Sequence, residues 1–256
     1  MSLYIKGQKI TRYDSGARKT FSLWFFLQNG GTFKQTYVDS FEGFFLPSDF
    51  KGIADMSYMF YDCVFLKSVP MLDTSAAMNM SYMFGGCTSL HTVPVFDTSN
   101  VTNMDYMFYN CRSFKDASYV PSLNTSKVTN MRNMFYSCSS LTSIPSFNTS
   151  SVTNMYAMFL SCRNLRSVPS LDASNVTNMS SMFSGCSSLE EIHMTGMKVS
   201  FDISASTKFT REALVEIIGN LAEVTSTQTL TMGSTNLAKL TDDDKAVATG
   251  KGWTLV

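Results

Sequence analysis

Residues 97–121 read DTSNVTNMDYMFYNCRSFKDASYVP, and close variants of this stretch recur along the chain. The central phrase Met-Phe-x-x-Cys appears six times, and its copies end at Cys63, Cys87, Cys111, Cys138, Cys162 and Cys186. The intervals between these cysteines are 24, 24, 27, 24 and 24 residues. A period of this size, held over more than half of a chain, predicts a stack of small repeated units.

The apolar side chains of the quoted unit follow a helical spacing. Four of them fall at positions i, i+3, i+4 and i+7, namely Met104, Met107, Phe108 and Cys111. This spacing places them on one face of a helix, and the preceding Thr102 or Asn103 supplies a side chain that can cap its first turn. We therefore predict a short helix in each repeat, with Met, Met, Phe and Cys facing the core.

The next part of each repeat, Ser-Leu-x-x-Val/Ile-Pro, predicts a short strand that its proline ends. The following Asp/Asn-Thr-Ser predicts a turn, because these side chains bond to nearby backbone amides. A lone unit buries too little apolar surface to offset the entropy of ordering it, so neighbouring units must stack. The predicted fold class is an α/β solenoid of about six 24-residue rungs, each a short helix plus a short parallel strand.

Non-repetitive segments flank the repeats and suggest three domains: residues 1–52, 53–200 and 201–256. The first contains predicted strands at 9–13, 20–27 and 32–38, with the hairpin signal Asn29-Gly30-Gly31 between the last two. We interpret it as a β-rich N-terminal cap, or alternatively as an attachment module. The last contains predicted helices at 210–221 and 241–250 and strands at 228–232 and 253–256. This α/β segment is interpreted as a C-terminal cap.

The charge balance of the chain argues against nucleic acid as a partner. The chain has 20 basic and 20 acidic residues, and charged residues make up 16% of it. Specific nucleic-acid binding normally needs a basic face. No window approaches the 18 apolar residues of a membrane span, and the first residues do not form a signal peptide. We expect a virion or cell-surface location, or a cytoplasmic one if the chain is not part of a particle.

No group of residues in the sequence predicts catalysis, a cofactor or a metal site. The two histidines, His91 and His193, have no matched partners in register. The acidic run at 242–244 is interpreted as charge at a helix N-terminus rather than a calcium site. The six cysteines are expected to be reduced and buried. The recurring Asn103, Asn130, Asn154 and Asn178 predict helix caps or a stacked column.

Two sets of tyrosines recur in register between the buried Met and Phe positions, and they are candidate ligand-binding residues. One set is Tyr58, Tyr82 and Tyr106, and the other is Tyr61, Tyr109 and Tyr136. Outward-facing aromatic columns can stack on sugar rings or anchor a protein partner, or they simply shield the edges of the buried face. A weaker basic row, with Lys67, Lys115 and Arg166, would favour an anionic partner. Ordinary scatter of surface charge explains this row nearly as well.

Residues 130–145, NMRNMFYSCSSLTSIP, and 154–169, NMYAMFLSCRNLRSVP, carry a family resemblance. They resemble the BspA-like leucine-rich repeat, close to its mycoplasma-lipoprotein variant, and the resemblance extends over roughly residues 53–194. It implies a leucine-rich-repeat-type solenoid and an association with surface adhesion and host or ligand contact, and it transfers no catalytic residues. Similar repeats occur in bacteriophage-associated proteins.

The repeat, the aromatic columns and the resemblance together favour a non-enzymatic recognition or adhesion module. We expect it to bind a glycan or protein on a cell surface, displayed on a phage virion or a bacterial surface. One alternative is a structural virion component that associates with copies of itself or with other virion proteins through the solenoid. The other is an intracellular protein-interaction scaffold.

Overall fold

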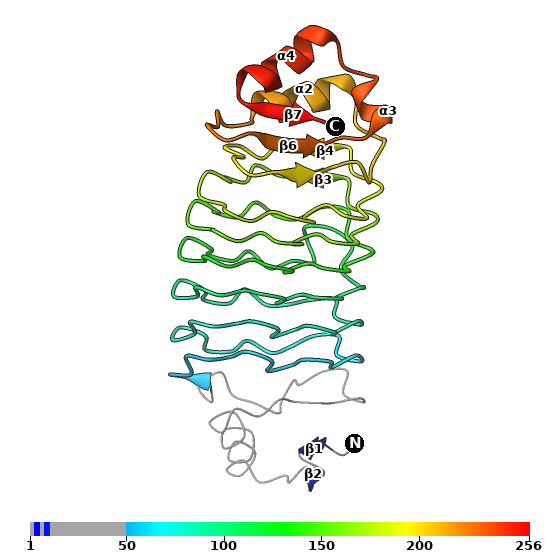
Figure 1. Ribbon diagram of the computed structural model, residues 1–256. Coiled ribbons are helices and arrows are strands. Elements are labelled where there is room, and N and C mark those ends of the chain that lie inside the picture. Colours follow the sequence, from blue (N-terminus) through cyan, green and yellow to red (C-terminus); the bar gives the residue numbers. More distant parts are fainter. Residues whose placement is uncertain (1–2, 6–7, 11–49) are drawn as a thin grey trace.

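The computed structural model describes residues 3–5, 8–10 and 50–256 of the chain. Thin rungs lie one above another along a single axis, and an α/β unit closes the C-terminal end of the stack (Figure 1). Parallel one-residue bridges join equivalent positions of successive rungs, from Asp55 to Asn79 and onward to Asn178. The predicted solenoid of stacked repeats is therefore confirmed over these residues.

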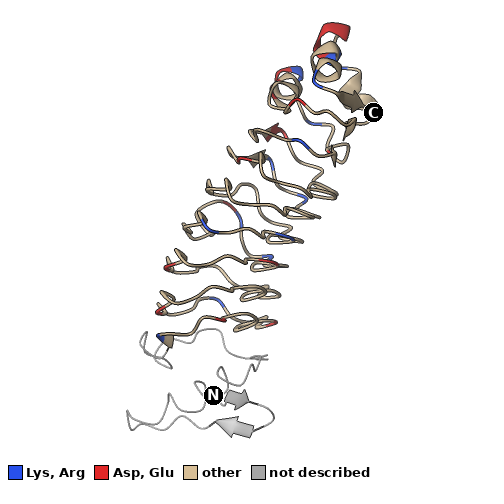
Figure 2. Ribbon diagram, turned by 60° about the vertical axis from the view of Figure 1, so that its left-hand side comes forward, with Lys and Arg blue, Asp and Glu red and all other residues tan. Residues whose placement is uncertain are grey.

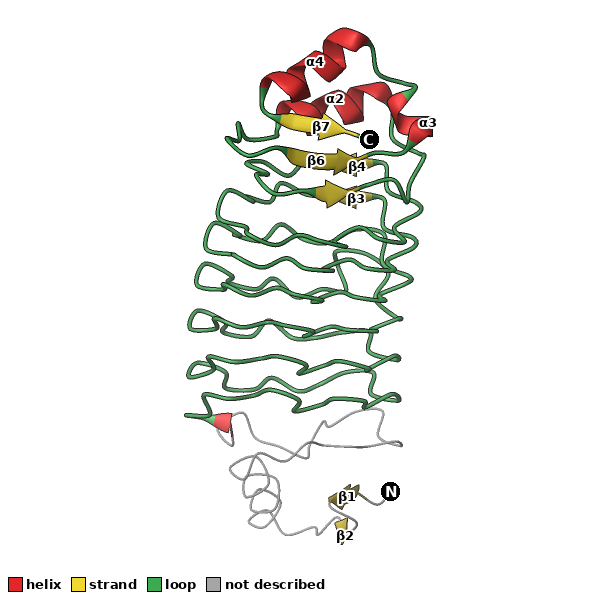
Figure 3. Cartoon of the chain, in the orientation of Figure 1, coloured by secondary structure: helices red, strands yellow, loops and turns green. Residues whose placement is uncertain are grey.

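The helix predicted in each repeat is wrong. Two consecutive tight turns replace it, with Met107 N donating to Met104 O at 3.2 Å and Cys111 N donating to Phe108 O at 3.2 Å. The third residue of each turn, Tyr106 and Asn110, has a left-handed φ of 55° and 57°. The rungs are accordingly drawn as loops, and the helices α2 to α4 lie at the C-terminal end of the chain (Figure 3).

The physical reason for the difference is the thickness of a rung. An α-helix with its side chains is roughly 10 Å across, whereas hydrogen-bonded layers of extended chain lie about 4.8 Å apart. The turns keep each rung thin, so that alternate N–H groups can reach the next rung: Tyr82 N donates to Asp105 O at 2.8 Å and Phe84 N donates to Met107 O at 2.9 Å. The inward spacing of the apolar residues is the same as in the predicted helix.

The strands predicted in the repeat are present in part. β3 (Ser167–Val168) pairs in parallel with β4 (Glu191–Ile192). Nearer the N-terminus the same segment forms a single parallel bridge between Ser68 and Thr92. A proline follows the segment in five of the six repeats and limits the ladder there, whereas β4 is followed by His193, whose N–H bonds to Val168 O at 3.0 Å.

The interior of the solenoid consists of columns of identical side chains. The Phe rings of successive Met-Phe pairs stack at centroid distances of 5.4 Å to 6.0 Å. All six cysteines are free and buried, as predicted. Their thiols are not merely apolar: Cys138 Sγ donates to Phe108 O, one rung below, at 3.0 Å. Burial raises the pKa of the Cys138 thiol to about 12.

The recurring asparagines form the stacked column that was one of the two predicted alternatives. Asn103 Nδ2 donates to Asn79 Oδ1 at 3.1 Å, and Asn130 Nδ2 donates to Asn103 Oδ1 at 3.1 Å. Each side-chain oxygen also accepts the backbone N–H two residues later, as Asn103 Oδ1 does from Asp105 N at 3.1 Å. The capping alternative fails because no helix follows these residues.

The C-terminal unit contains a parallel sheet and three helices. The sheet has the order β5-β6-β7, with β5 at Phe201–Asp202, β6 at Gln228–Thr231 and β7 at Trp253–Leu255. The helices are α2 (Arg211–Gly219), α3 (Ser234–Leu237) and α4 (Asp242–Gly250). The predicted helices at 210–221 and 241–250 are α2 and α4, and the predicted strands are β6 and β7.

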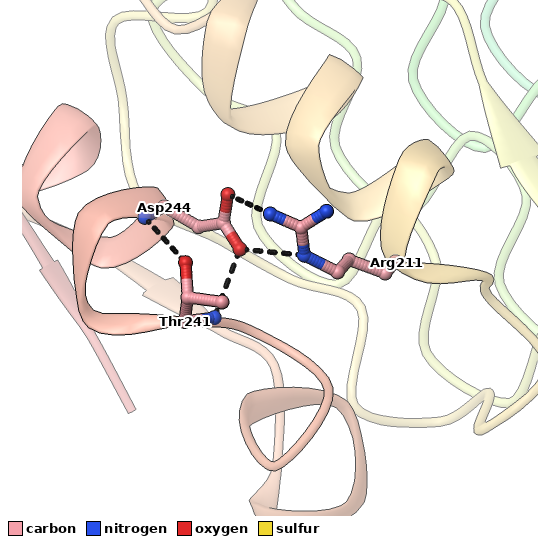
Figure 4. A network of polar contacts seen from close by, with 3 residues as sticks. All are labelled: Arg211, Thr241 and Asp244. Atoms are coloured by element: carbon pink, nitrogen blue, oxygen red, sulfur yellow. Dashed lines mark hydrogen bonds and ion pairs between the residues drawn. The ribbon is translucent and has the colours of Figure 1, made fainter.

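Polar contacts tie α2 to the beginning of α4 (Figure 4). Thr241 and Asp244 form a capping box in which each side chain accepts the other's backbone N–H. Arg211 donates to both carboxylate oxygens of Asp244, from Nε at 2.8 Å and from Nη2 at 2.7 Å. The acidic run therefore acts at a helix N-terminus, as predicted.

At the other end of the chain, β1 (Leu3–Ile5) pairs antiparallel with β2 (Gln8–Ile10), which overlaps the strand predicted at 9–13. The strands predicted at 20–27 and 32–38, with their hairpin turn, lie outside the described residues. Over the residues that are described, none of the helices has the length and apolar character needed to cross a membrane.

Candidate functional site: a tyrosine face on the solenoid

Three of the candidate tyrosines form a continuous stack. The rings of Tyr58 and Tyr82 lie 4.6 Å apart with planes inclined by 8°, and those of Tyr82 and Tyr106 lie 4.3 Å apart with planes inclined by 11°. Each tyrosine is the third residue of the first turn, with left-handed φ values of 55° to 57°. That backbone conformation directs the side chain outward, and the one-rung interval brings the rings into face-to-face contact.

The other three tyrosines lie beside this stack. Tyr61 meets Tyr58 and Tyr82 edge-on at 5.5 Å and 5.8 Å. Tyr109 contacts Tyr136 at 5.2 Å. The second column is interrupted at Gly85, where an added Cβ would lie 3.2 Å from the Tyr61 ring, so that this ring covers the glycine. We call the six residues the tyrosine face: Tyr58, Tyr61, Tyr82, Tyr106, Tyr109 and Tyr136.

The stacking determines which parts of the rings a ligand can reach. Tyr58 and Tyr82 sit against each other, and Tyr106 covers the second face of Tyr82. The members of the face are half-buried, and Tyr58 is the most open at 36% exposed. Burial raises the pKa of the Tyr82 phenol, with smaller contributions from the neighbouring tyrosines and Asp105. The Tyr82 hydroxyl therefore remains a neutral donor, and the stack presents ring edges and O–H groups.

Two charged residues missed by the sequence reasoning belong to this surface. The Arg132 guanidinium lies 5.7 Å from the Tyr106 ring centroid and 5.3 Å from that of Tyr156. Asp105 lies one rung below Arg132 in the same register. Burial raises the pKa of the Asp105 carboxyl to about 6, while the charge of Arg132 opposes this shift. The sequence did contain a sign that Asp105 and Arg132 lie close together, because both directly follow the first Met of a repeat.

Two buried polar atoms near this point have no hydrogen-bond partner among the described residues. They are Asp105 Oδ1 and Asn133 Nδ2. Asn133 continues the register of Tyr58, Tyr82 and Tyr106, and it is 2% exposed. The tyrosine stack therefore ends at polar residues, since Asp105 precedes Tyr106 in the chain and Asn133 takes the next position of the register.

The three predicted basic residues are exposed and share one register. Backbone bonds join their column from rung to rung, with His91 N donating to Lys67 O at 2.9 Å, Thr142 N donating to Lys115 O at 2.7 Å and Arg166 N donating to Thr142 O at 2.9 Å. Lys67, Lys115 and Arg166 thus lie along one line of the stack, but His91 and Thr142 separate them.

The two histidines have structural contacts, and the cysteines are buried. His193 follows β4 and its Nδ1 lies 2.7 Å from Glu216 Oε1 of α2, which raises the pKa of the imidazole. His91 Nδ1 contacts the Ser89 carbonyl. Buried thiols of raised pKa are poor nucleophiles. Among the described residues, no three His, Cys, Asp or Glu side chains are grouped so as to hold a metal ion.

Comparison with known proteins found one family. The chain matches the family described as mycoplasma protein of unknown function, DUF285, over residues 32–120 and 117–212, a region that includes all six copies of Met-Phe-x-x-Cys. A crystal structure of a leucine-rich repeat protein from Bacteroides ovatus is similar over 78% of this chain and 80% of that chain, with 11% identity and a TM-score of 0.22. A TM-score of this size carries no argument. The comparison with curated proteins found no match.

Proposed function

Given that this chain belongs to the family of mycoplasma proteins of unknown function, DUF285, we propose a function from its own surface. The protein is a non-enzymatic recognition and adhesion module that binds a glycan or protein on a cell surface. It is displayed on a phage virion or a bacterial surface, and it binds through the tyrosine face. The basic column with Lys67, Lys115 and Arg166 supports binding of an anionic partner.

The observation that carries this proposal is the mutual contact of the half-buried aromatic side chains of the tyrosine face. Tyrosine and arginine are enriched at the centres of protein interfaces, where they supply contact area with few rotatable bonds. Here the stacking within the tyrosine face and the backbone bonds between rungs hold the rings in place before any partner arrives. A preorganised surface loses less entropy on binding.

The test is adhesion of the purified protein to intact cells. Replacement of Tyr82, Tyr106 and Tyr109 by Ala is expected to weaken adhesion, because these residues form the centre of the face. The matched control replaces exposed apolar residues outside the face, Met78 and Val247, by Ala. Circular dichroism first confirms that both variants are folded. Adhesion that survives the tyrosine substitutions would refute the site, and an equal loss of adhesion in the control would count against it.

One observation favours the alternative of a structural component that associates with itself. Met71 and Val95 occupy one register and are 52% and 60% exposed, whereas the later rungs carry Ser122, Ser146 and Ser170 there. Exposed apolar residues in adjacent rungs are suited to contact with another copy. Light scattering over a concentration series tests this candidate, since Met71→Ser and Val95→Ser would then reduce the average mass. A monomer at all concentrations would remove it.

A further inference from the structure

The Arg132 guanidinium lies between two aromatic rings. It lies over the rings of Tyr106, one rung below, and Tyr156, one rung above. The side chain is exposed, and within the described part of the chain no hydrogen bond or ion pair engages the guanidinium. Its planar set of N–H donors is therefore restrained and unoccupied. An arginine restrained in this way loses little conformational entropy when it binds.

Basic residues outnumber acidic ones in the middle rungs, to which Arg132 belongs (Figure 2). Residues 99–166 contain six basic and two acidic side chains, although the chain as a whole is balanced. One of the two acidic residues, Asp105, is half-buried with one oxygen enclosed. The middle rungs thus have an excess of positive charge, which raises the local concentration of anionic partners.

The stacked rings favour a protein over a sugar. A sugar ring that stacks on an aromatic side chain needs an open ring face, but Tyr58 and Tyr106 cover Tyr82 and Arg132 lies over the other side of Tyr106. On this stack, ring edges, phenol hydroxyls and a restrained arginine remain. These groups suit the carbonyls, carboxylates and aromatic side chains of a polypeptide.

We propose that Arg132 anchors an Asp- or Glu-rich segment of a partner protein on the tyrosine face. A carboxylate of that segment accepts two parallel hydrogen bonds from the guanidinium, a geometry that arginine supports and lysine does not. The phenol hydroxyls beside it donate to backbone carbonyls of the same segment. This inference rests on the proposed recognition function and assigns the partner's chemistry.

The test measures binding of a fluorescein-labelled, glutamate-rich peptide to the whole protein by fluorescence anisotropy, with a glutamine-rich peptide of equal length for comparison. The glutamate peptide is expected to bind and the glutamine peptide is not. Arg132→Gln is expected to lower the affinity for the glutamate peptide about tenfold, which is the effect of losing an arginine at the centre of an interface. Arg132→Lys is expected to lose most of that affinity despite its retained charge. If the lysine variant binds as well as the wild type, the bidentate contact is refuted.

The control variant is Arg163→Gln, which makes the same charge change at another exposed arginine. Affinity is expected to fall by less than about twofold, since a rim charge contributes little to affinity. Equal losses for the two variants would overturn the proposal, because general electrostatic attraction would then explain binding. A heparin-derived hexasaccharide that binds more tightly, with the same dependence on Arg132, would overturn the choice of a protein partner. The peptide measurement uses no cells, so its failure is distinct from a failure of cell adhesion.

Discussion

The asparagine column makes a quantitative prediction about stability. Asn103→Ala removes three hydrogen bonds: Nδ2 to Asn79 Oδ1, Asn130 Nδ2 to Asn103 Oδ1, and Asp105 N to Asn103 Oδ1, each at 3.1 Å. A net contribution of about 1 kcal/mol for each bond gives a loss of about 3 kcal/mol in the free energy of unfolding. A loss of this size is a large fraction of the stability of a typical domain.

Two further variants separate the column from a general effect of losing an asparagine. Asn103→Asp retains the accepting oxygen and loses only the donor, so a loss of about 1 kcal/mol is expected. The residue that begins the column, Asp55, has this same accepting role toward Asn79. Asn175→Ala removes a single exposed bond to Ser150 O and is expected to lose at most about 1 kcal/mol.

The measurement is urea unfolding followed by circular dichroism. The slope of the unfolding free energy against urea concentration should be equal in all variants, which confirms that they unfold in the same transition. The expected order of stability is wild type, then Asn103→Asp and Asn175→Ala together, then Asn103→Ala. If Asn103→Ala were no less stable than Asn175→Ala, the side-chain ladder would contribute nothing beyond the backbone bonds between rungs, and the reasoning would be refuted.

Three other predictions concern the same structure. Gly252→Ala is expected to lower the free energy of unfolding by at least about 2 kcal/mol, because Gly252 has a φ of 86° and an added Cβ would lie 2.5 Å from Val224 O. Gly250→Ala places its Cβ in open space and should be neutral or slightly stabilising, which thermal unfolding of both variants measures. The six buried thiols should react with Ellman's reagent only on unfolding, and rapid reaction of the native protein would contradict their burial. The pKa of Asp105 is raised in the folded state, so its ionised carboxylate destabilises the folded protein above pH 6, and this cost falls as the pH decreases toward 4. In urea titrations the stability difference between Asp105→Asn and the wild type should therefore shrink over that range.

The repeat could be predicted from the sequence, but the path of its backbone could not. The spacing of Met104, Met107, Phe108 and Cys111 reports which side chains face inward, and a helix and a pair of turns satisfy it equally. What decides between them is a hydrogen bond to a residue 23 to 26 positions away, as in Tyr82 N to Asp105 O, and periodicity carries no information about such a bond. The C-terminal helices were easier, because α2 and α4 have local capping signals at Thr210 and Thr241.

A signal for the turns was nevertheless present. The second left-handed position of successive rungs holds Asp62, Gly86, Asn110, Ser137, Ser161 and Gly185. Glycine, asparagine and aspartate are the residues that most readily adopt this conformation, and their recurrence is unusual inside a helix. The first left-handed position gives no such signal, because Tyr58, Tyr82 and Tyr106 occupy it with a positive φ.

The columns of tyrosines could be predicted from the sequence. The shared register of the tyrosines placed them in columns, and the structure shows that one rung of separation stacks their rings closely enough to cover the ring faces. Arg132 was missed because arginine occurs only once in its register. The contacts of Arg132 with Tyr106 and Tyr156 form between neighbouring rungs, so they become visible only once the rungs are stacked.

The alternation of inward and outward residues along each turn has an evolutionary consequence. The residue after the first Met is successively Ser57, Ser81, Asp105, Arg132, Tyr156 and Ser180, while the Met itself never changes. Hydrogen bonds between rungs use the backbone at these positions, so a new side chain there alters the display without disturbing the framework. Such a chain can acquire a different specificity one layer at a time, by exchange or duplication of whole repeats, and remain foldable at every step.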